Sequence, residues 1–234
     1  MSTKPSTRQA YRQSDTGYSK SADTRRAILR AAIVAFGRAG YSAATTRQIA
    51  DAAGVNQPAI SYYFGGKDGL YQACAEEILA DFTGPLEEVS QRAFEAIATG
   101  LDRRGAASQL KELLSALADV MILSEEVSEA AGFIGREMRE PGLAYQILYR
   151  NLWAPGIELA ATLIAMVKGR AEIEPADRVD AIMMISGISA FAPGHSVSMQ
   201  VMQWQAAGED GKALVLERLE AQILGWIRTR GAGE

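Results

Sequence analysis

Apolar residues in this chain recur three or four positions apart, and this spacing constrains the fold more than any other feature of the sequence. In the first strongly periodic segment, Ile28, Ala32, Ala35, Phe36 and Ala39 fall on one face of a helix. Runs that alternate apolar and polar residues and are rich in valine, isoleucine and threonine, as strands are, do not occur. The spacing therefore predicts an all-α protein.

Capping residues, glycine and proline divide the N-terminal part of the chain into three helices. A hydroxyl of the Thr45 and Thr46 pair can accept a hydrogen bond from an unpaired backbone N–H, so a helix is expected to start there. Asn56 is expected to cap a shorter helix with Pro58 in its first turn, where a missing N–H is tolerated. We predict helices over residues 21–39 (capped by Ser21 or Asp23), 45–53 and 56–64, ended by glycines at 40, 54 and 65–66.

The rest of the chain also has helical periodicity, interrupted by glycine and proline. A longer helix is expected to begin at Lys67 and to end or kink at Thr83, Gly84 and Pro85. Further helical segments are predicted near residues 86–99, 106–123, 125–139, 142–169, 176–203 and 210–229.

The distribution of charge separates the start of the chain from the remainder. Residues 1–67 hold ten Lys or Arg against three acidic residues, a balance of +7 in a chain whose net charge is −4. A cationic end on an anionic body suits a protein that presents one end to a polyanion such as DNA. Solvated helix faces explain the same charges equally well, so the charge pattern alone leaves both interpretations open.

Two short helices joined by a turn at Gly54 within this cationic segment form a helix-turn-helix, whose second helix is expected in a DNA major groove. Gln57 can pair with the edge of an adenine, and Pro58 and Ala59 can contact a thymine methyl group. The hydroxyls that follow, from Ser61, Tyr62 and Tyr63, suit phosphate oxygens.

The stretch TTRQIADAAGVNQPAISYYFGGKDGLY resembles the N-terminal signature of the TetR family of transcriptional regulators, over about 50 residues from Arg26 to Ile78. The family commonly has a tyrosine at the position of Ser61 and often a glycine at that of Pro58. The resemblance implies that these residues contact DNA: Thr46, Arg47, Gln57, Pro58, Ala59, Ser61, Tyr62, Tyr63 and Lys67. Of these, Arg47 and Lys67 are expected near phosphates.

A second segment, GREMREPGLAYQILYRNLWAPGIELAATLIAMVKGR, resembles the body of the CecR-like TetR regulators. This resemblance implies a divergent helical domain that binds a small molecule and forms a homodimer through the last two helices, here roughly 176–203 and 210–229. The expected organisation is a flexible basic arm over residues 1–20, a helix-turn-helix domain over 21–66 and a ligand-binding and dimerisation domain over 67–234.

Large apolar and aromatic side chains of the body could line a pocket for an apolar or aromatic ligand, although core packing accounts for any one of them at least as well. Arg139, with its neighbours Arg136 and Glu137, could anchor a polar group or belong to a surface ion-pair cluster. The candidate ligand-binding residues are Met121, Phe133, Met138, Arg139, Tyr145, Tyr149, Trp153, Met184 and Phe191.

Other classes of function find little support. A single histidine, His195, lacks a nucleophile elbow and an acid partner, and with the single cysteine, Cys74, it cannot form a typical transition-metal site. Phosphate-loop and dinucleotide-binding motifs are absent, so we expect neither a catalytic site nor a metal or cofactor. Cys74 is expected to pack in the core or, alternatively, to sense redox state. With no signal-peptide pattern and no apolar run long enough for a bilayer, the cytoplasm is the expected location.

The sequence thus predicts a homodimeric repressor that binds double-stranded DNA at a pseudo-palindromic operator and is released by a small-molecule effector. Two alternatives are an enzyme with its pocket in the helical body and an architectural protein that binds DNA with little sequence preference.

Overall fold

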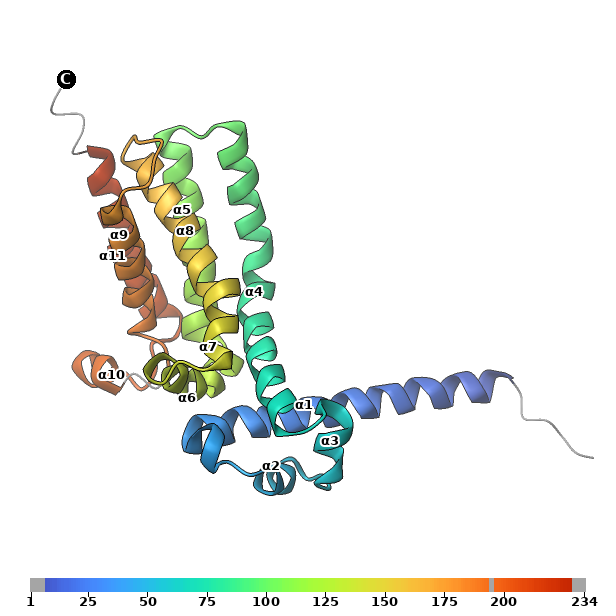
Figure 1. The fold of residues 1–234 in the computed structure, drawn as a ribbon. Coiled ribbons are helices and arrows are strands. Elements are labelled where there is room, and N and C mark those ends of the chain that lie inside the picture. Colours follow the sequence, from blue (N-terminus) through green and yellow to red (C-terminus); the bar gives the residue numbers. More distant parts are fainter. Residues whose placement is uncertain (1–6, 194–195, 229–234) are drawn as a thin grey trace, which may run out of the picture. The chain divides into compact units, whose positions relative to one another are not determined.

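The structure, a computed structural model, describes residues 7–193 and 196–228, and every regular element in these two ranges is a helix (Figure 1). The prediction of an all-α protein is confirmed. The α-helices are α1 (Thr7–Ala43), α2 (Thr46–Ala53), α3 (Pro58–Phe64), α4 (Lys67–Thr99), α5 (Arg103–Ala118), α6 (Glu125–Arg139), α7 (Leu143–Leu148), α8 (Ala154–Val167), α9 (Pro175–Ser189), α10 (Ser196–Met202) and α11 (Gly208–Arg228). Two short π-helical segments are η1 (Asp119–Leu123) and η2 (Tyr149–Trp153).

The chain divides into two compact units that do not follow sequence order. The first comprises the described chain up to Glu77 together with Gly132–Ala144, and the second comprises Ile78–Ala131 with the described residues from Tyr145 onward. The first unit therefore contains the three N-terminal helices, the start of α4 and the C-terminal half of α6.

Helix α1 begins earlier than the sequence indicated. It starts at Thr7 instead of at Ser21 or Asp23, so much of the segment predicted as an arm is helical. Thr7 to Ala39 contains no proline, and its alanines, glutamines and arginines are compatible with helix, so no local signal forces a later start. Gly40 interrupts the helix as predicted, because its φ of +79° lies in the region that favours glycine.

The core of the first unit joins one face of each N-terminal helix. Among the side chains exposed by 1% or less are residues of α1 (Ile28, Leu29, Ala32, Phe36), α2 (Ile49, Ala50), α3 (Ile60) and α4 (Leu70, Cys74). Burial stabilises the fold by roughly 1.5–3 kcal/mol for each large aliphatic or phenylalanine side chain. Burial also raises the pKa of the Cys74 thiol, which keeps it neutral and favours the core role over redox sensing.

Two of the predicted helix ends are wrong. α4 continues through Pro85 to Thr99, so the helix does not end at Thr83 to Pro85, where the sequence predicted an end or a kink; a proline removes one backbone hydrogen bond and need not end a long helix. The segment predicted as one helix over 176–203 is instead α9 and α10. After Ser189 the chain enters successive tight turns, and Pro193 lacks the N–H that a continuing helix would use.

The core of the second unit lies between the second half of α4 and helices α5, α8, α9 and α11. Among its most buried side chains are Leu110 on α5, Leu163 and Ile164 on α8, Ile188 on α9 and Ile223 on α11. Helix α8 packs against both α5 and α9, so it is the central helix of this unit.

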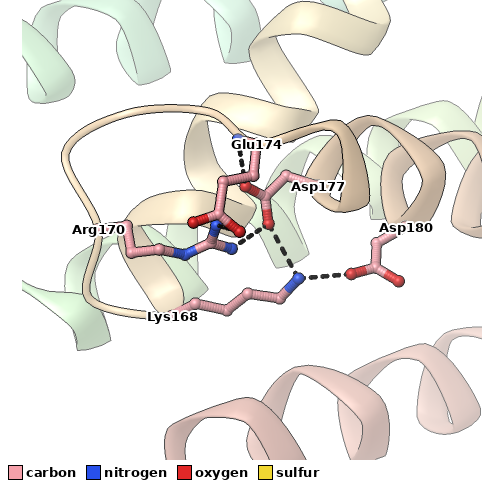
Figure 2. A network of polar contacts seen from close by, with 5 residues as sticks. All are labelled: Lys168, Arg170, Glu174, Asp177 and Asp180. Atoms are coloured by element: carbon pink, nitrogen blue, oxygen red, sulfur yellow. Dashed lines mark hydrogen bonds and ion pairs between the residues drawn. The ribbon is translucent and has the colours of Figure 1, made fainter.

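A buried carboxylate closes the turn between α8 and α9 (Figure 2). Asp177 has 0% exposure and accepts hydrogen bonds from Lys168 Nζ at 2.9 Å, from the Arg170 guanidinium and from the Glu174 backbone N–H at 2.9 Å. Lys168 also donates to Asp180. Burial alone would raise the pKa of Asp177, but these bonds and charges outweigh it and lower that pKa.

Candidate nucleic-acid interface

Helix α2 is fixed at its start by a reciprocal pair of hydrogen bonds. Thr45 Oγ1 accepts from the Gln48 backbone N–H at 3.2 Å, and Gln48 Oε1 accepts from the Thr45 backbone N–H at 3.0 Å. This capping box satisfies two donors that helix geometry leaves unpaired. Because Thr45 is the cap, Thr46 is the first helical residue and its side chain is available for other contacts.

The turn between α2 and α3 depends on a glycine. Gly54 has φ +68° and ψ +30°, a left-handed conformation, and its N–H bonds the carbonyls of Ala50 and Asp51. A residue with a Cβ would be strained in this conformation. The predicted stop at Gly54 is therefore confirmed.

Asn56 caps α3, as the sequence predicted. Its Oδ1 accepts a hydrogen bond from the Ala59 backbone N–H at 3.2 Å. Gln57 already has helical dihedral angles (φ −57°, ψ −37°) and Pro58 lies in the first turn. The helix therefore begins with Asn56 as its cap, and Gln57 extends from the first turn.

The two faces of α3 differ in exposure. Ile60 is 1% exposed and faces the core, whereas Tyr62 is 82% exposed and Gln57, Pro58 and Ser61 are also exposed. An open hollow beside this helix is lined by Thr24, Val55, Asn56, Pro58, Ala59, Tyr62 and Tyr63. The helix thus presents a surface of amide, hydroxyl and aromatic groups.

Tyr63 differs from its neighbours because it also holds α3 to α1. Its hydroxyl lies 3.1 Å from Ser21 Oγ at hydrogen-bond distance, and its ring makes an edge contact with Tyr62 at a centroid distance of 5.0 Å. A substitution at Tyr63 would therefore affect the placement of the helix as well as any phosphate contact.

The candidate phosphate contacts also differ in their surroundings. Arg47 is exposed on α2. Lys67, at the start of α4, is half-buried: its Nζ donates to the Ser42 carbonyl at 3.4 Å and lies 4.5 Å from the centre of the Tyr41 ring. The hydroxyl of Tyr41 in turn donates to Asp68, and this hydrogen bond raises the pKa of Tyr41.

One further contact connects candidate residues across the turn. Gln57 Nε2 donates a hydrogen bond of 3.0 Å to Thr46 Oγ1, and the two residues stand at the beginnings of α3 and α2. The family resemblance made both residues candidate DNA contacts, but the sequence did not indicate that they contact each other.

The C-terminal half of α6 packs into the same unit as the helix-turn-helix. Phe133 is 1% exposed and lies against the Tyr71 ring at a centroid distance of 5.1 Å. Tyr71 donates a hydrogen bond to Glu137, a carboxylate with 3% exposure, and burial together with this bond raises the pKa of Tyr71. Arg136 donates to the Gly37 and Arg38 carbonyls of α1 at 3.4 and 3.2 Å.

Sequence reasoning missed most of this junction. It treated Arg136 and Glu137 as a ligand anchor or a surface ion pair, whereas Glu137 is buried beneath Tyr71. An exposed carboxylate and a buried one look alike in sequence. The only sequence signal was that a tyrosine occupies an apolar position of the α4 face.

The nine candidate ligand-binding residues are divided between the two units. Phe133, Met138 and Arg139 belong to the first, where Met138 and Arg139 are exposed. In the second unit, Met184 is 1% exposed in the core, Met121 and Phe191 pack against that core, and Phe191 lies 6.1 Å from the Trp204 ring centre. Their role in ligand binding stays a prediction.

Three of these candidates come together on α7 and η2. The Tyr145 ring lies 5.9 Å from Tyr149, nearly parallel to it, and 5.5 Å from Trp153. Tyr149 is 47% exposed. Such partly exposed rings can stack on an apolar or aromatic ligand, and π-helical segments such as η2 are frequent at functional sites.

Features of other function classes are few in the described ranges. His195 lies outside them. Within residues 7–193 and 196–228, no group of three or more His, Cys, Asp or Glu side chains is arranged to hold a metal ion. None of the helices in those ranges combines the length and apolarity needed to cross a bilayer.

Two family models match the chain, on the segments that carried the predicted resemblances. Residues 28–74 match the model for bacterial regulatory proteins of the tetR family, and residues 106–225 match that for the C-terminal domain of the HTH-type transcriptional dual regulator CecR. The CecR protein of Shigella flexneri is 30% identical over 207 residues, which cover 87% of this chain and 91% of that protein.

Solved structures share the fold at lower identity. AibR, solved in complex with isovaleryl coenzyme A and operator DNA, has a TM-score of 0.59 and 12% identity, covering 85% of this chain and 97% of that one. The fatty acid degradation regulator FadR of Bacillus halodurans has a TM-score of 0.56 and 18% identity, covering 88% and 96%.

Proposed function

Because this chain belongs to the TetR family of DNA-binding transcriptional regulators, we propose that it is a homodimeric repressor released from a pseudo-palindromic operator by a small molecule. The observation that carries the proposal is the exposed face of α3. Asn56 caps this helix and Gly54 forms the turn before it. Its exposed face presents Gln57 and Tyr62 to a major groove, while Ile60 packs into the core. Like its relatives, the chain is a regulator and not an enzyme.

A dimer follows from the geometry of operator recognition. Two recognition helices reach successive major-groove faces only when they stand about 34–36 Å apart, or a multiple of that distance. The apolar stripe on α9 supports self-association: Val179, Ile182 and Met183 are 53%, 47% and 61% exposed at helical spacing. On α11, Leu214 and Leu224 are also exposed.

The proposed effector is apolar or aromatic and binds in the second unit. The partly exposed rings of Tyr145, Tyr149 and Trp153 support this chemistry. Release requires that the effector bind the conformation that cannot bind DNA more tightly than the one that can. Each tenfold loss of operator affinity needs about 1.4 kcal/mol of this difference in effector affinity. Such a regulator acts in the cytoplasm, where its operator lies.

Selection from random DNA with the full-length chain tests the proposal. We expect enrichment of an inverted repeat, with affinity for that repeat at least about 1,000-fold above that for random DNA at physiological salt. Binding to all sequences with similar affinity would instead identify an architectural protein. A screen for compounds that raise the melting temperature of the chain, followed by measurement of operator affinity in their presence, then identifies effectors.

A further inference from the structure

The hydrogen bond between Gln57 and Thr46 joins a candidate base-reading residue to a second candidate DNA contact. Gln57 Nε2 donates to Thr46 Oγ1 at 3.0 Å across the helix-turn-helix. Thr46 is half-buried and Gln57 is exposed. The α2 cap is Thr45, so the Thr46 hydroxyl is not needed to start the helix.

We propose that Thr46 is a positioning residue for base readout, which orients the Gln57 amide toward adenine when a DNA phosphate binds the Thr46 hydroxyl. This inference rests on the proposed function, because it assigns a positioning contact within the same DNA-binding surface. It makes phosphate binding and sequence recognition interdependent at one point.

The chemistry of the two groups gives the orientation. A threonine hydroxyl can donate one hydrogen bond and accept others, whereas a phosphate oxygen only accepts. Once the Thr46 hydroxyl donates its hydrogen bond to a phosphate oxygen, Thr46 Oγ1 can interact with Gln57 only as an acceptor. The Gln57 amide must then face Thr46 with Nε2, as it does here.

That orientation leaves the groups needed for adenine. Gln57 Nε2 has two hydrogens, and the one trans to Oε1 suits Thr46. The other hydrogen and Oε1 lie on the same edge of the amide, where they match adenine N7, an acceptor, and the N6 amino group, a donor. Guanine offers two acceptors at these positions, so an amide held in this orientation discriminates against it.

The test measures base preference on the operator selected by the wild-type chain. Comparison of the selections with wild type and Gln57→Ala first identifies the position that Gln57 reads. Equilibrium affinities are then measured on operators that carry each of the four bases there. Thr46→Val keeps the shape of the side chain but removes the hydroxyl, and we expect it to reduce the adenine preference about 3- to 10-fold.

Further variants separate positioning from a general loss of affinity. Thr46→Ser keeps the hydroxyl and should keep the preference, and Thr46→Ala should lose it as Thr46→Val does. In a Gln57→Ala background, Thr46→Val should leave the remaining base preference unchanged, since no amide is left to orient. Arg47→Ala, on the same helix, should weaken binding to all four operators equally.

The outcomes distinguish this inference from the proposed function. Absence of sequence-specific binding by the wild-type chain would overturn both. Specific binding whose preference survives Gln57→Ala, or Thr46→Val, would overturn the inference alone. So would a loss of preference that Thr46→Ser shares, because the hydroxyl would then not be its cause.

Discussion

Two cations, Arg47 and Lys67, were assigned to phosphates by the same resemblance but have different surroundings. Arg47 is exposed on α2, whereas Lys67 also bonds the Ser42 carbonyl and covers the Tyr41 ring. Alanine at either position should lower the slope of log affinity against log salt by about 0.9, on all DNA sequences alike. Only Lys67→Ala should also lower the melting temperature, which calorimetry of the free protein measures. An unchanged salt slope would remove the residue from the phosphate contacts.

A second effect at the residue scale depends on pH. The folded state lowers the pKa of Asp177, so the stability it contributes is present above its ordinary pKa of about 4 and is lost as pH falls through the lower folded value. Asp177→Asn should remove this acid dependence and cost about 3 kcal/mol at pH 7, because Lys168 and Arg170 lose their buried partner. Urea unfolding followed by tryptophan fluorescence measures this, since Trp153, Trp204 and Trp226 all lie in the second unit.

Glu158 provides the matched control for Asp177. It too joins α8 to α9 and has a lowered pKa, because Arg178 donates to it at 2.6 and 3.0 Å. This pair is exposed, so water and salt screen it. Glu158→Gln should therefore change the urea midpoint only slightly, and a loss as large as that of Asp177→Asn would contradict the role of burial.

At the scale of elements, helix caps and turns can be predicted from local sequence, whereas long-range contacts cannot. The starts of α2 and α3 and the stop at Gly54 were predictable because Thr45, Asn56 and Gly54 act through hydrogen bonds within a few residues. The early start of α1 and the π-helical segments have no comparable local signal. The burial of Glu137 depends on Tyr71, 66 residues away in sequence.

The crossing of α1 with the C-terminal half of α6 is a further long-range feature and gives an element-scale prediction. A Cβ on Gly37 would lie 2.8 Å from the Phe133 backbone nitrogen and 3.0 Å from the Gly132 carbonyl carbon. Backbone atoms cannot relieve such a clash by a change of rotamer. Gly37→Ala should therefore separate these helices and destabilise the first unit by about 1–3 kcal/mol. Hydrogen exchange of α1 amides would report the loss.

Gly84 in α4 is the control of opposite sign. A Cβ there would meet nothing within 4 Å, and the residue lies inside a helix. Gly84→Ala should stabilise the chain by about 0.5–1 kcal/mol through helix propensity. If both alanine variants stabilise the chain, then the close approach of α1 and α6 is not as tight as the structure indicates.

At the scale of the whole molecule, the uneven charge and the helical spacing together predicted a cationic helix-turn-helix on an anionic helical body. What sequence could not separate were the apolar residues of the core, the ligand site and the dimer surface, since all three use the same side chains. The structure separates some of them: Met184 is 1% exposed, whereas Met183, its neighbour on α9, is 61% exposed. Helix geometry turns adjacent residues about 100° apart, so only the register of α9 decides their roles.

That register makes the dimer testable. Ile182→Asp places a charge on the exposed stripe of α9, where burial against a second copy would be unfavourable. We expect the variant to sediment as a monomer and to bind a full operator at least about tenfold more weakly, while its affinity for a single half-site stays unchanged. Phe94→Asp introduces the same charge at an apolar side chain that is 55% exposed on α4, and it should remain dimeric with normal operator affinity. A dimeric Ile182→Asp variant with full operator affinity would place the self-association surface elsewhere.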